Sequence, residues 1–195
     1  MIRFFRQLCK ATLEHLSDEA AFREATDGFS HYSEHCPSCG AVGKLTRYSH
    51  YSRSLVSLDC GKINDSRISP LRFKCSSCGT THALLVGNLI PYSPYSLHFM
   101  LTVLIAYFER NTTVCVVCQQ YGIAVSTLYA WKHRLLDHKE LALGALLSLK
   151  KPALVFLRDL FGSDQVFDYL SGFFSRYGFS FMQNLRLKTS RCHPP

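Results

Sequence analysis

The pattern Cys-x-x-Cys-Gly occurs twice in this chain, and it constrains the fold more than any other feature of the sequence. The first copy reads CPSCG at residues 36–40, and the second reads CSSCG at residues 75–79. Two thiolates three residues apart on a tight turn can face one ion, and the glycine permits the positive φ that closes the turn. Both copies together offer four thiolates, the ligand number of a tetrahedral structural zinc. The predicted ligands are Cys36, Cys39, Cys75 and Cys78.

The segment between the two copies is predicted to form strands. Residues 44–60 and 68–75 are rich in β-branched and aromatic side chains, and the INDS sequence at 63–66 suits a turn between them. The THALLV sequence at 81–86 is predicted to be a further strand. This order of turns and strands is the layout of a zinc ribbon, although the 35 residues between Cys39 and Cys75 exceed the commonest zinc-site spacing.

Two alternatives for these cysteines remain compatible with the sequence: a redox pair and unbound thiols. A thioredoxin-like pair is a single Cys-x-x-Cys at the start of a helix, whereas two copies among strands favour a structural metal. The site type favours zinc over iron. Cys60 and His82 lie nearby, but neither has the required spacing, so neither is expected to be a ligand.

Charge favours an anionic partner. The formal net charge is +8 and the pI is about 9.1, which favours nucleic acid first and a membrane surface second. Residues 36–90 carry seven Lys or Arg and two acidic residues. Part of this excess offsets the thiolates and the rest is available to phosphates; a solvated basic face is the alternative.

Location is predicted from the apolar segments. The first twenty residues contain no apolar h-region, and the apolar runs at 97–108 and 141–149 are too short to span a bilayer. We therefore expect a cytoplasmic protein with no membrane partner. Its nine cysteines are then expected to be reduced or metal-bound.

A third Cys-x-x-Cys, formed by Cys115 and Cys118, has a different setting. No glycine or proline follows it, and the local period is helical. Taking Gly122 as the turn glycine of a helix-turn-helix places apolar residues where that motif needs them. We interpret both cysteines as packing residues, and an ordinary helical pair is the alternative. The predicted inward residues are Val117, Cys118, Tyr121, Ile123, Leu128 and Trp131.

The second helix of this motif, at residues 124–134, is predicted to be a recognition helix. Short hydroxyl side chains and a tyrosine near a helix N-terminus can reach base edges and phosphates in the major groove. Ala124 stands where a Ser or Thr N-cap is expected, and Ser126 is the alternative cap. A support helix with an apolar stripe is predicted to start at Ser96. The predicted DNA-binding set is Val125, Ser126, Thr127, Tyr129, Ala130, Lys132, His133 and Arg134.

These motifs, over residues 31–138, resemble the N-terminal zinc-ribbon and helix-turn-helix region of bacterial insertion-sequence transposases, and short stand-alone proteins that carry only that region. The resemblance implies binding to the DNA ends of a mobile element. In full-length relatives a separate RNase H-like domain with three metal-binding acids cuts the strands. Residues 141–195 are too few for such a domain, so we expect no enzymatic activity and no small-molecule substrate. Three acids there are interpreted as surface or helix-capping residues: Asp159, Asp164 and Asp168.

The sequence predicts an α+β fold, a small four-cysteine zinc-ribbon β-domain followed by a helical helix-turn-helix domain. The first arm is predicted to be an amphipathic helix with Phe5, Leu8 and Leu16 inward, and residues 179–188 are predicted to be a strand. The predicted divisions are an N-terminal helical arm at 1–30, the zinc ribbon at 31–90, the DNA-binding domain at 91–140, and a helical extension with a disordered tail at 141–195.

We therefore expect a zinc-containing DNA-binding protein related to transposases, with one structural Zn²⁺ and DNA as its partner. A homodimer is compatible with the apolar C-terminal helices. The alternatives are a helix-turn-helix transcriptional regulator, a transposase completed by a separate chain, and a zinc-ribbon protein-interaction module that does not bind DNA. Salt-dependent DNA affinity separates the last alternative from the others.

Overall fold

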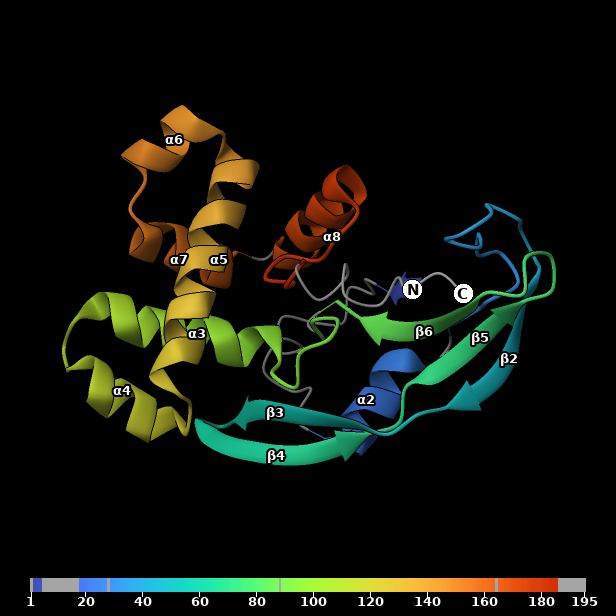
Figure 1. The fold of residues 1–195 in the computed structure, drawn as a ribbon, viewed down its shortest axis with the longest axis horizontal. Coiled ribbons are helices and arrows are strands. Elements are labelled where there is room, and N and C mark those ends of the chain that lie inside the picture. The colour runs from blue at the N-terminus through green and yellow to red at the C-terminus, as the bar shows by residue number, and fades with distance from the viewer. Residues whose placement is uncertain (1, 5–17, 28, 88, 164, 186–195) are drawn as a thin grey trace, which may run out of the picture. The chain divides into compact units, whose positions relative to one another are not determined.

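The chain divides into two compact units, Met1–Leu89 and Ile90–Pro195. The computed structural model in Figure 1 describes residues 2–4, 18–27, 29–87, 89–163 and 165–185. Small β-sheets characterise the first unit, and helices form the second. The predicted α+β fold class, with four clustered cysteines in the β part, is confirmed. In the described ranges, every helix is too short or too polar to cross a bilayer.

A four-stranded sheet with the order β1-β6-β5-β2 carries the first unit. Strands β2, β5 and β6 are antiparallel neighbours and lie side by side in Figure 1, whereas β1 pairs with β6 in parallel. Strands β3 and β4 form a separate two-stranded hairpin. The elements are β1 (Ile2–Phe4), α2 (Glu19–Thr26), β2 (Leu45–His50), β3 (Arg53–Asp59), β4 (Lys62–Ile68), β5 (Leu71–Cys75) and β6 (Thr81–Val86).

The β3–β4 hairpin turns earlier than the sequence predicts. Asp59 pairs with Lys62, so Cys60 and Gly61 form a two-residue turn, with φ of 46° and 76°. Positive φ at both central residues is typical of a type I′ turn, whose twist matches that of antiparallel strands. The prediction of a turn at residues 63–66 was wrong, because these polar residues lie within β4 and pair with β3.

The prediction of a helical arm at residues 1–30 was wrong for residues 2–4. Ile2–Phe4 form β1, because the edge of β6 offers backbone partners to this apolar segment. Helix α2 begins at Glu19, and Asp18 caps it by accepting a hydrogen bond from the Ala21 N–H at 2.9 Å. Three residues that were predicted to face inward lie outside the described residues: Phe5, Leu8 and Leu16.

Two apolar clusters hold the first unit together. The first joins α2 to the β3–β4 hairpin and to the end of β6, and consists of Phe22, Leu55, Ile68, Leu85, Val86 and Leu89. The second consists of Cys36, Leu45, Phe73, Cys75 and Leu84. Two of its five members are cysteines, so the packing of this second cluster is coupled to the state of their sulfur atoms.

Six helices form the described part of the second unit. Helix α3 begins as predicted after Ser96, whose Oγ accepts a hydrogen bond from the Phe99 N–H at 3.1 Å. Leu97, Met100 and Leu101 on this helix are fully buried. The helices are α3 (Leu97–Glu109), α4 (Val114–Tyr121), α5 (Val125–Leu143), α6 (Ala145–Lys150), α7 (Ala153–Gly162) and α8 (Val166–Tyr177).

Helix α5 departs from the prediction at its start and at its end. Its N-cap is Ala124, which makes no side-chain capping bond, and Ser126 lies inside the helix. The alternative prediction that Ser126 caps a later start is therefore wrong. The helix continues to Leu143, past the division that we drew at residue 140. The buried Lys139 ties its end to α6 by donating hydrogen bonds to the last carbonyls of that segment.

The segment after α8 is not the predicted strand. Phe181, Met182 and Gln183 are all buried in succession, whereas a strand would alternate between its two faces. Met182 has a φ of 64°, which is incompatible with a strand. The remainder of the predicted strand, residues 186–188, lies outside the described ranges.

Candidate metal centre and candidate nucleic-acid interface

Two nearly identical turns carry the four predicted ligands; we call residues 36–40 and 75–79 the first and second cysteine turns. In the first, the Gly40 N–H donates to the Cys36 carbonyl at 2.8 Å, and in the second the Gly79 N–H donates to the Cys75 carbonyl at 2.9 Å. Gly40 and Gly79 have φ of 73° and 72°. Each glycine therefore adopts the left-handed conformation that closes its turn.

Strand pairing brings the two turns together. Strand β2 follows the first turn and β5 leads into the second, with Leu45 opposite Cys75. The Ser76 N–H also donates to the Lys44 carbonyl at 2.8 Å, which fixes the second turn against the start of β2. Cys39 and Cys75, which are 36 positions apart in the sequence, thus become neighbours through one antiparallel ladder.

The four sulfur atoms form one cluster, and all lie within 4.8 Å of one another. The Sγ atoms of Cys36 and Cys78 are 3.7 Å apart, and those of Cys39 and Cys75 are 3.8 Å apart. A tetrahedral site with metal–sulfur bonds of about 2.3 Å has sulfur atoms about 3.8 Å apart. Both distances across the two turns fit this value, so the group could hold a metal ion.

The surroundings of two sulfur atoms favour the thiolate form. The hydroxyl and the backbone N–H of Thr80 hydrogen-bond to Cys78 and lower its pKa to about 6. Burial opposes ionisation of Cys36, but backbone N–H bonds from Ser38 and Cys39, together with side-chain contacts from Cys39 and Cys75, outweigh burial and lower its pKa. A thiolate is the form that ligates a metal, so these contacts prepare the site for a cation.

Cys39 behaves in the opposite way. The Ala41 N–H favours its thiolate, but burial and the contacts with the other cysteines outweigh this bond and raise the pKa of Cys39 to about 11. Thiolates at these distances repel one another unless a positive charge lies between them. A bound cation would remove this repulsion, so metal binding and ionisation of the four thiols are coupled.

His82 lies beside the cluster rather than in it. Its Nε2 is 3.3 Å from the Cys36 Sγ, and the side chain is buried on β6. Burial lowers the pKa of His82, so its ring is neutral near pH 7 and can donate one N–H to sulfur. Cys60, by contrast, is exposed at the tip of the β3–β4 hairpin and lies outside the four-sulfur cluster. The sequence analysis did not predict the hydrogen bonds from Thr80 to Cys78. The position of Thr80 directly after Cys-Gly could have indicated them.

Helices α4 and α5 are joined by a tight turn at Gly122. Its φ is 61°, and the Ile123 N–H donates to the Cys118 carbonyl at 3.0 Å, which ends α4. Below the turn, Leu128 and Trp131 of α5 are buried. The inward residues predicted for these two helices are buried or, for Tyr121, half-buried: Val117, Cys118, Tyr121, Ile123, Leu128 and Trp131.

The predicted DNA-binding set occupies the first three turns of α5. Thr127 and Lys132 are half-buried. Arg134 is also half-buried, and its guanidinium donates to the Met182 carbonyl at 3.2 Å, which turns it toward the segment after α8. The exposed members of the set are Val125, Ser126, Tyr129, Ala130 and His133.

Tyr107 of α3 adjoins this set, and sequence analysis missed it. The Lys132 Nζ lies 5.7 Å from the ring centroids of both Tyr107 and Tyr129, and the two rings are 6.3 Å apart. These cation–π contacts hold the Lys132 side chain on the outer surface of α5 without cancelling its charge. Tyr107 lies outside the apolar stripe of α3, and this outward position could have indicated a surface role from the sequence.

The third cysteine pair is only partly as predicted. Cys118 is 6% exposed and packs inward, and burial raises its pKa. Cys115 is exposed, so its assignment as a packing residue was wrong. The inward stripe of α4 is centred between Val117 and Cys118, and at roughly 100° per residue Cys115 lies about 110° away from that centre.

Two of the remaining candidates make local contacts within the helical unit. Asp159 forms an ion pair with Lys151, and Asp168 lies in the first turn of α8, where an acid stabilises the helix dipole. Three others lie outside the described residues: Asp164, Cys192 and His193.

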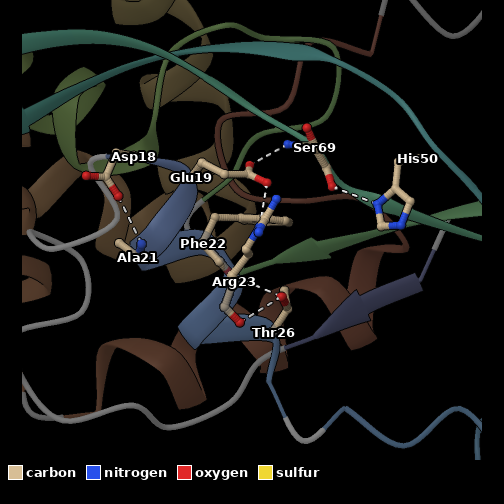
Figure 2. Close-up of polar contacts among 8 residues, drawn as sticks. All are labelled: Asp18, Glu19, Ala21, Phe22, Arg23, Thr26, His50 and Ser69. Atoms are coloured by element: carbon tan, nitrogen blue, oxygen red, sulfur yellow. Dashed lines mark hydrogen bonds and ion pairs between the residues drawn. The ribbon is translucent and has the colours of Figure 1, made fainter.

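An open groove of about 420 Å³ lies between α2 and strands β2 and β5. Figure 2 shows the contacts at its edge. The Glu19 carboxylate accepts hydrogen bonds from the Ser69 N–H at 2.7 Å and from the Arg23 Nε at 2.9 Å, and the His50 Nδ1 donates to the Ser69 carbonyl at 3.3 Å. Glu19 and Arg23 neutralise each other, so this network ties α2 to the sheet and leaves little net charge in the groove.

A scan against protein-family models found no match, and comparisons with curated proteins and with solved structures also found none.

Proposed function

We propose that this protein binds DNA through α4 and α5, that a structural zinc ion stabilises its first unit, and that it acts on mobile-element DNA without cutting it. The observation that carries the DNA-binding proposal is the exposed N-terminal half of α5 directly after the Gly122 turn. Buried Leu128 and Trp131 anchor this helix from below, so its outer side chains are presented on a rigid element.

The chemistry of the exposed face supports DNA as the partner. Ser126 and Tyr129 supply hydroxyl groups near the start of the helix, and both side chains are exposed. Lys132 retains a positive charge between two tyrosine rings. A helix that enters the major groove contacts bases with its N-terminal residues and phosphates with neighbouring cations, which matches this distribution.

The donor set supports zinc as the metal. Four thiolates at tetrahedral spacing are typical of structural zinc sites, and zinc requires no redox chemistry or further ligand there. Cys36, Cys39, Cys75 and Cys78 would hold the ion, and the ion would cross-link the two cysteine turns. Residues of the chain then provide the rest of the site: the Thr80 and His82 donors bond to two of the sulfur atoms.

The test is selection of bound duplexes from a random DNA library by the full-length protein. We expect the wild-type protein to enrich a short motif, and a Ser126→Ala, Tyr129→Ala variant to lose that preference while keeping its fold. Leu146→Ala is the matched control, because Leu146 is 78% exposed on α6 and carries no charge. An unchanged motif in the double variant would remove α5 as the reading helix.

The form of the selected motif sharpens the proposal. A single asymmetric site fits the end of a mobile element. Two inverted half-sites one helical turn apart would favour a dimeric transcriptional regulator instead. Absence of any salt-dependent affinity for DNA would contradict DNA binding altogether and favour a protein-interaction module.

A further inference from the structure

The outer face of the sheet formed by β2, β5 and β6 carries cations at regular spacing. Phe73 and Cys75 of β5 are buried on the inner face, and the intervening Arg72 and Lys74 are exposed on the outer one. Thr46 and Thr81 stand directly opposite Lys74 on the flanking strands, so they share its face. We call the following group the basic ladder face: Thr46, Tyr48, Tyr51, Arg72, Lys74 and Thr81. Tyr48 lies at the irregularity of β2 between Arg47 and Ser49, so it also lines the edge of the groove.

Two tyrosine rings support these two cations. The Lys74 Nζ lies 5.6 Å from the centroid of the Tyr48 ring, and the Arg72 guanidinium carbon lies 4.7 Å from that of Tyr51. Tyr48 is 59% exposed. A cation–π contact restrains a long side chain and so reduces the entropy that it would lose on binding a ligand, but it leaves the positive charge uncompensated.

No acidic residue offsets this charge along the neighbouring sequence. Residues 35–58 and residues 66–108 contain no Asp or Glu, and these two segments include all of β2, β5 and β6. The opposite side of the sheet differs, because there Arg23 is paired with Glu19 beside the groove. Among the residues that the structure describes, the cations of the basic ladder face are therefore ordered by tyrosine rings and form no ion pair with an acid.

The spacing of the cations fits a polyanion. Residues two apart on a strand lie about 7 Å apart on the same face. Each strand of a nucleic acid duplex carries one phosphate per about 3.4 Å of axis, so two phosphates fall within that span. The Thr81 and Tyr48 hydroxyls beside the cations are donors that also bind phosphate oxygens.

We propose that the basic ladder face is a second nucleic-acid contact of this protein, which binds the phosphodiester backbone without reading its sequence. Arg72 and Lys74 bind phosphates, Tyr48 and Tyr51 position these cations, and the Thr81 hydroxyl donates a hydrogen bond. The Thr46 hydroxyl instead donates to the Lys74 carbonyl at 3.2 Å and steadies the strand beside it. The inference rests on the proposed DNA-binding function and extends it from α5 to the sheet of the first unit.

The test measures the affinity of the full-length, metal-loaded protein for a random-sequence duplex and a single strand of equal length at several salt concentrations. An Arg72→Gln, Lys74→Gln variant should weaken binding to every sequence and lower the slope of log affinity against log salt by about two, because two phosphate contacts are lost. A larger loss on the single strand than on the duplex identifies the unpaired backbone as the preferred form, and the reverse identifies the duplex.

The matched control is Arg23→Gln with Arg47→Gln, which removes the same charge from the groove side of the sheet. The charge-preserving variant Arg72→Lys, Lys74→Arg should keep the wild-type slope. Equal losses in the groove control and in the Arg72→Gln, Lys74→Gln variant would overturn the inference, and so would an unchanged slope in that variant. Metal content and circular dichroism of each variant verify that the fold is intact.

The two proposals fail in different ways. If the wild-type protein binds DNA and α5 variants change its motif, but the Arg72→Gln, Lys74→Gln variant keeps its salt slope, only the basic ladder face is refuted. If the wild-type protein binds neither duplex nor single strand, both proposals are refuted. Binding to vesicles of anionic phospholipid in the absence of DNA binding would assign the face to a membrane surface and also refute the inference.

Discussion

Two regions of this molecule use the same Cys-x-x-Cys spacing with different results. In each cysteine turn of the first unit a glycine with positive φ follows the second cysteine, so the chain reverses and both sulfur atoms reach one cluster. In the second unit Gln119 follows Cys118, α4 continues to Tyr121, and Cys115 and Cys118 point in different directions. The residue after the pair, more than the spacing, therefore decides whether two cysteines can share an ion.

The two regions also depend on different sources of stability. One apolar cluster of the first unit has five members, and two of them are predicted metal ligands, Cys36 and Cys75. The helical unit instead buries large side chains such as Phe99, Leu128 and Trp131. A cluster built partly from metal ligands is expected to lose its order without the ion, whereas a core of large apolar side chains is not.

The largest effect should come from removing one ligand. Cys75→Ser, at a fully buried ligand position, should abolish metal binding and unfold the first unit while α3–α8 stay folded. Structural zinc contributes about 10–16 kcal/mol in finger peptides, which exceeds the stability of a small domain. Elemental analysis and amide hydrogen exchange measure the two effects.

Cys115→Ser is the matched control for the ligand variant. It should leave both the metal content and the exchange pattern as in the wild type. A Cys75→Ser protein with a protected, metal-free β-sheet would contradict the claim that metal binding and folding are coupled in the first unit.

The next effect should come from the helical core. Trp131 is 3% exposed, and its ring packs on Tyr95 and Phe99 at centroid distances of 4.9 and 6.2 Å. Trp131→Ala should destabilise the second unit by about 3–5 kcal/mol, because it leaves a large cavity. Far-UV circular dichroism during denaturation measures this loss. The metal content of the Trp131→Ala protein should stay at the wild-type value. Loss of metal from this variant would show that metal binding in the first unit depends on the helical core.

Acid should weaken the second unit through His138. This ring is 4% exposed and its Nδ1 accepts a hydrogen bond from the Met182 N–H at 2.9 Å. Burial, with a smaller effect of the Arg134 charge, lowers the pKa of His138 from 6.5 to about 4. In the unfolded chain, His138 is therefore protonated below pH 6.5. In the folded chain, the same ring is protonated only near pH 4. Stability from this group is complete above pH 6.5 and declines by up to about 3 kcal/mol as the pH falls to 4.

The measurement for His138 is denaturation followed by the fluorescence of the single tryptophan, Trp131, at pH 7 and pH 4.5. His138→Asn keeps an acceptor for the Met182 N–H but does not titrate. It should therefore show a smaller loss of stability on acidification than the wild-type protein. Equal losses in the two proteins would mean that the acid sensitivity of this unit arises elsewhere.

The smallest effect should distinguish the two members of the third cysteine pair. Cys118→Ala removes a buried sulfur and should cost about 1 kcal/mol, because one small apolar group is lost from the helix crossing. Cys115→Ser should change stability by less than about 0.5 kcal/mol, since its side chain is exposed. Thermal unfolding of both variants measures the difference. A reversed order would place Cys115 in the core.

Much of the fold could be predicted from local patterns. The strand at Thr81–Val86, the start of α3 after Ser96 and the turn at Gly122 each follow from a few neighbouring residues. The four-cysteine cluster could be predicted too, because each turn is a local structure with a glycine in a defined place. These features require little from the rest of the chain.

Other features could not be predicted, because distant partners decide them. Ile2–Phe4 form a strand because β6 has an edge to pair with. The polar residues 63–66 join β4 because β3 supplies their hydrogen bonds. Phe181 and its neighbours are buried in succession rather than alternating. In each case a tertiary contact outweighs the local preference of the segment.

The sequence by itself determined the donor chemistry, the glycines that close the cysteine turns and the helical period around Cys118, because these properties arise within one turn of backbone. Only the tertiary structure decided which sulfur atoms converge, that Cys115 is exposed, and that Arg72 and Lys74 lie against tyrosine rings. Convergence of this kind depends on strand register and packing, which no short segment of the chain encodes.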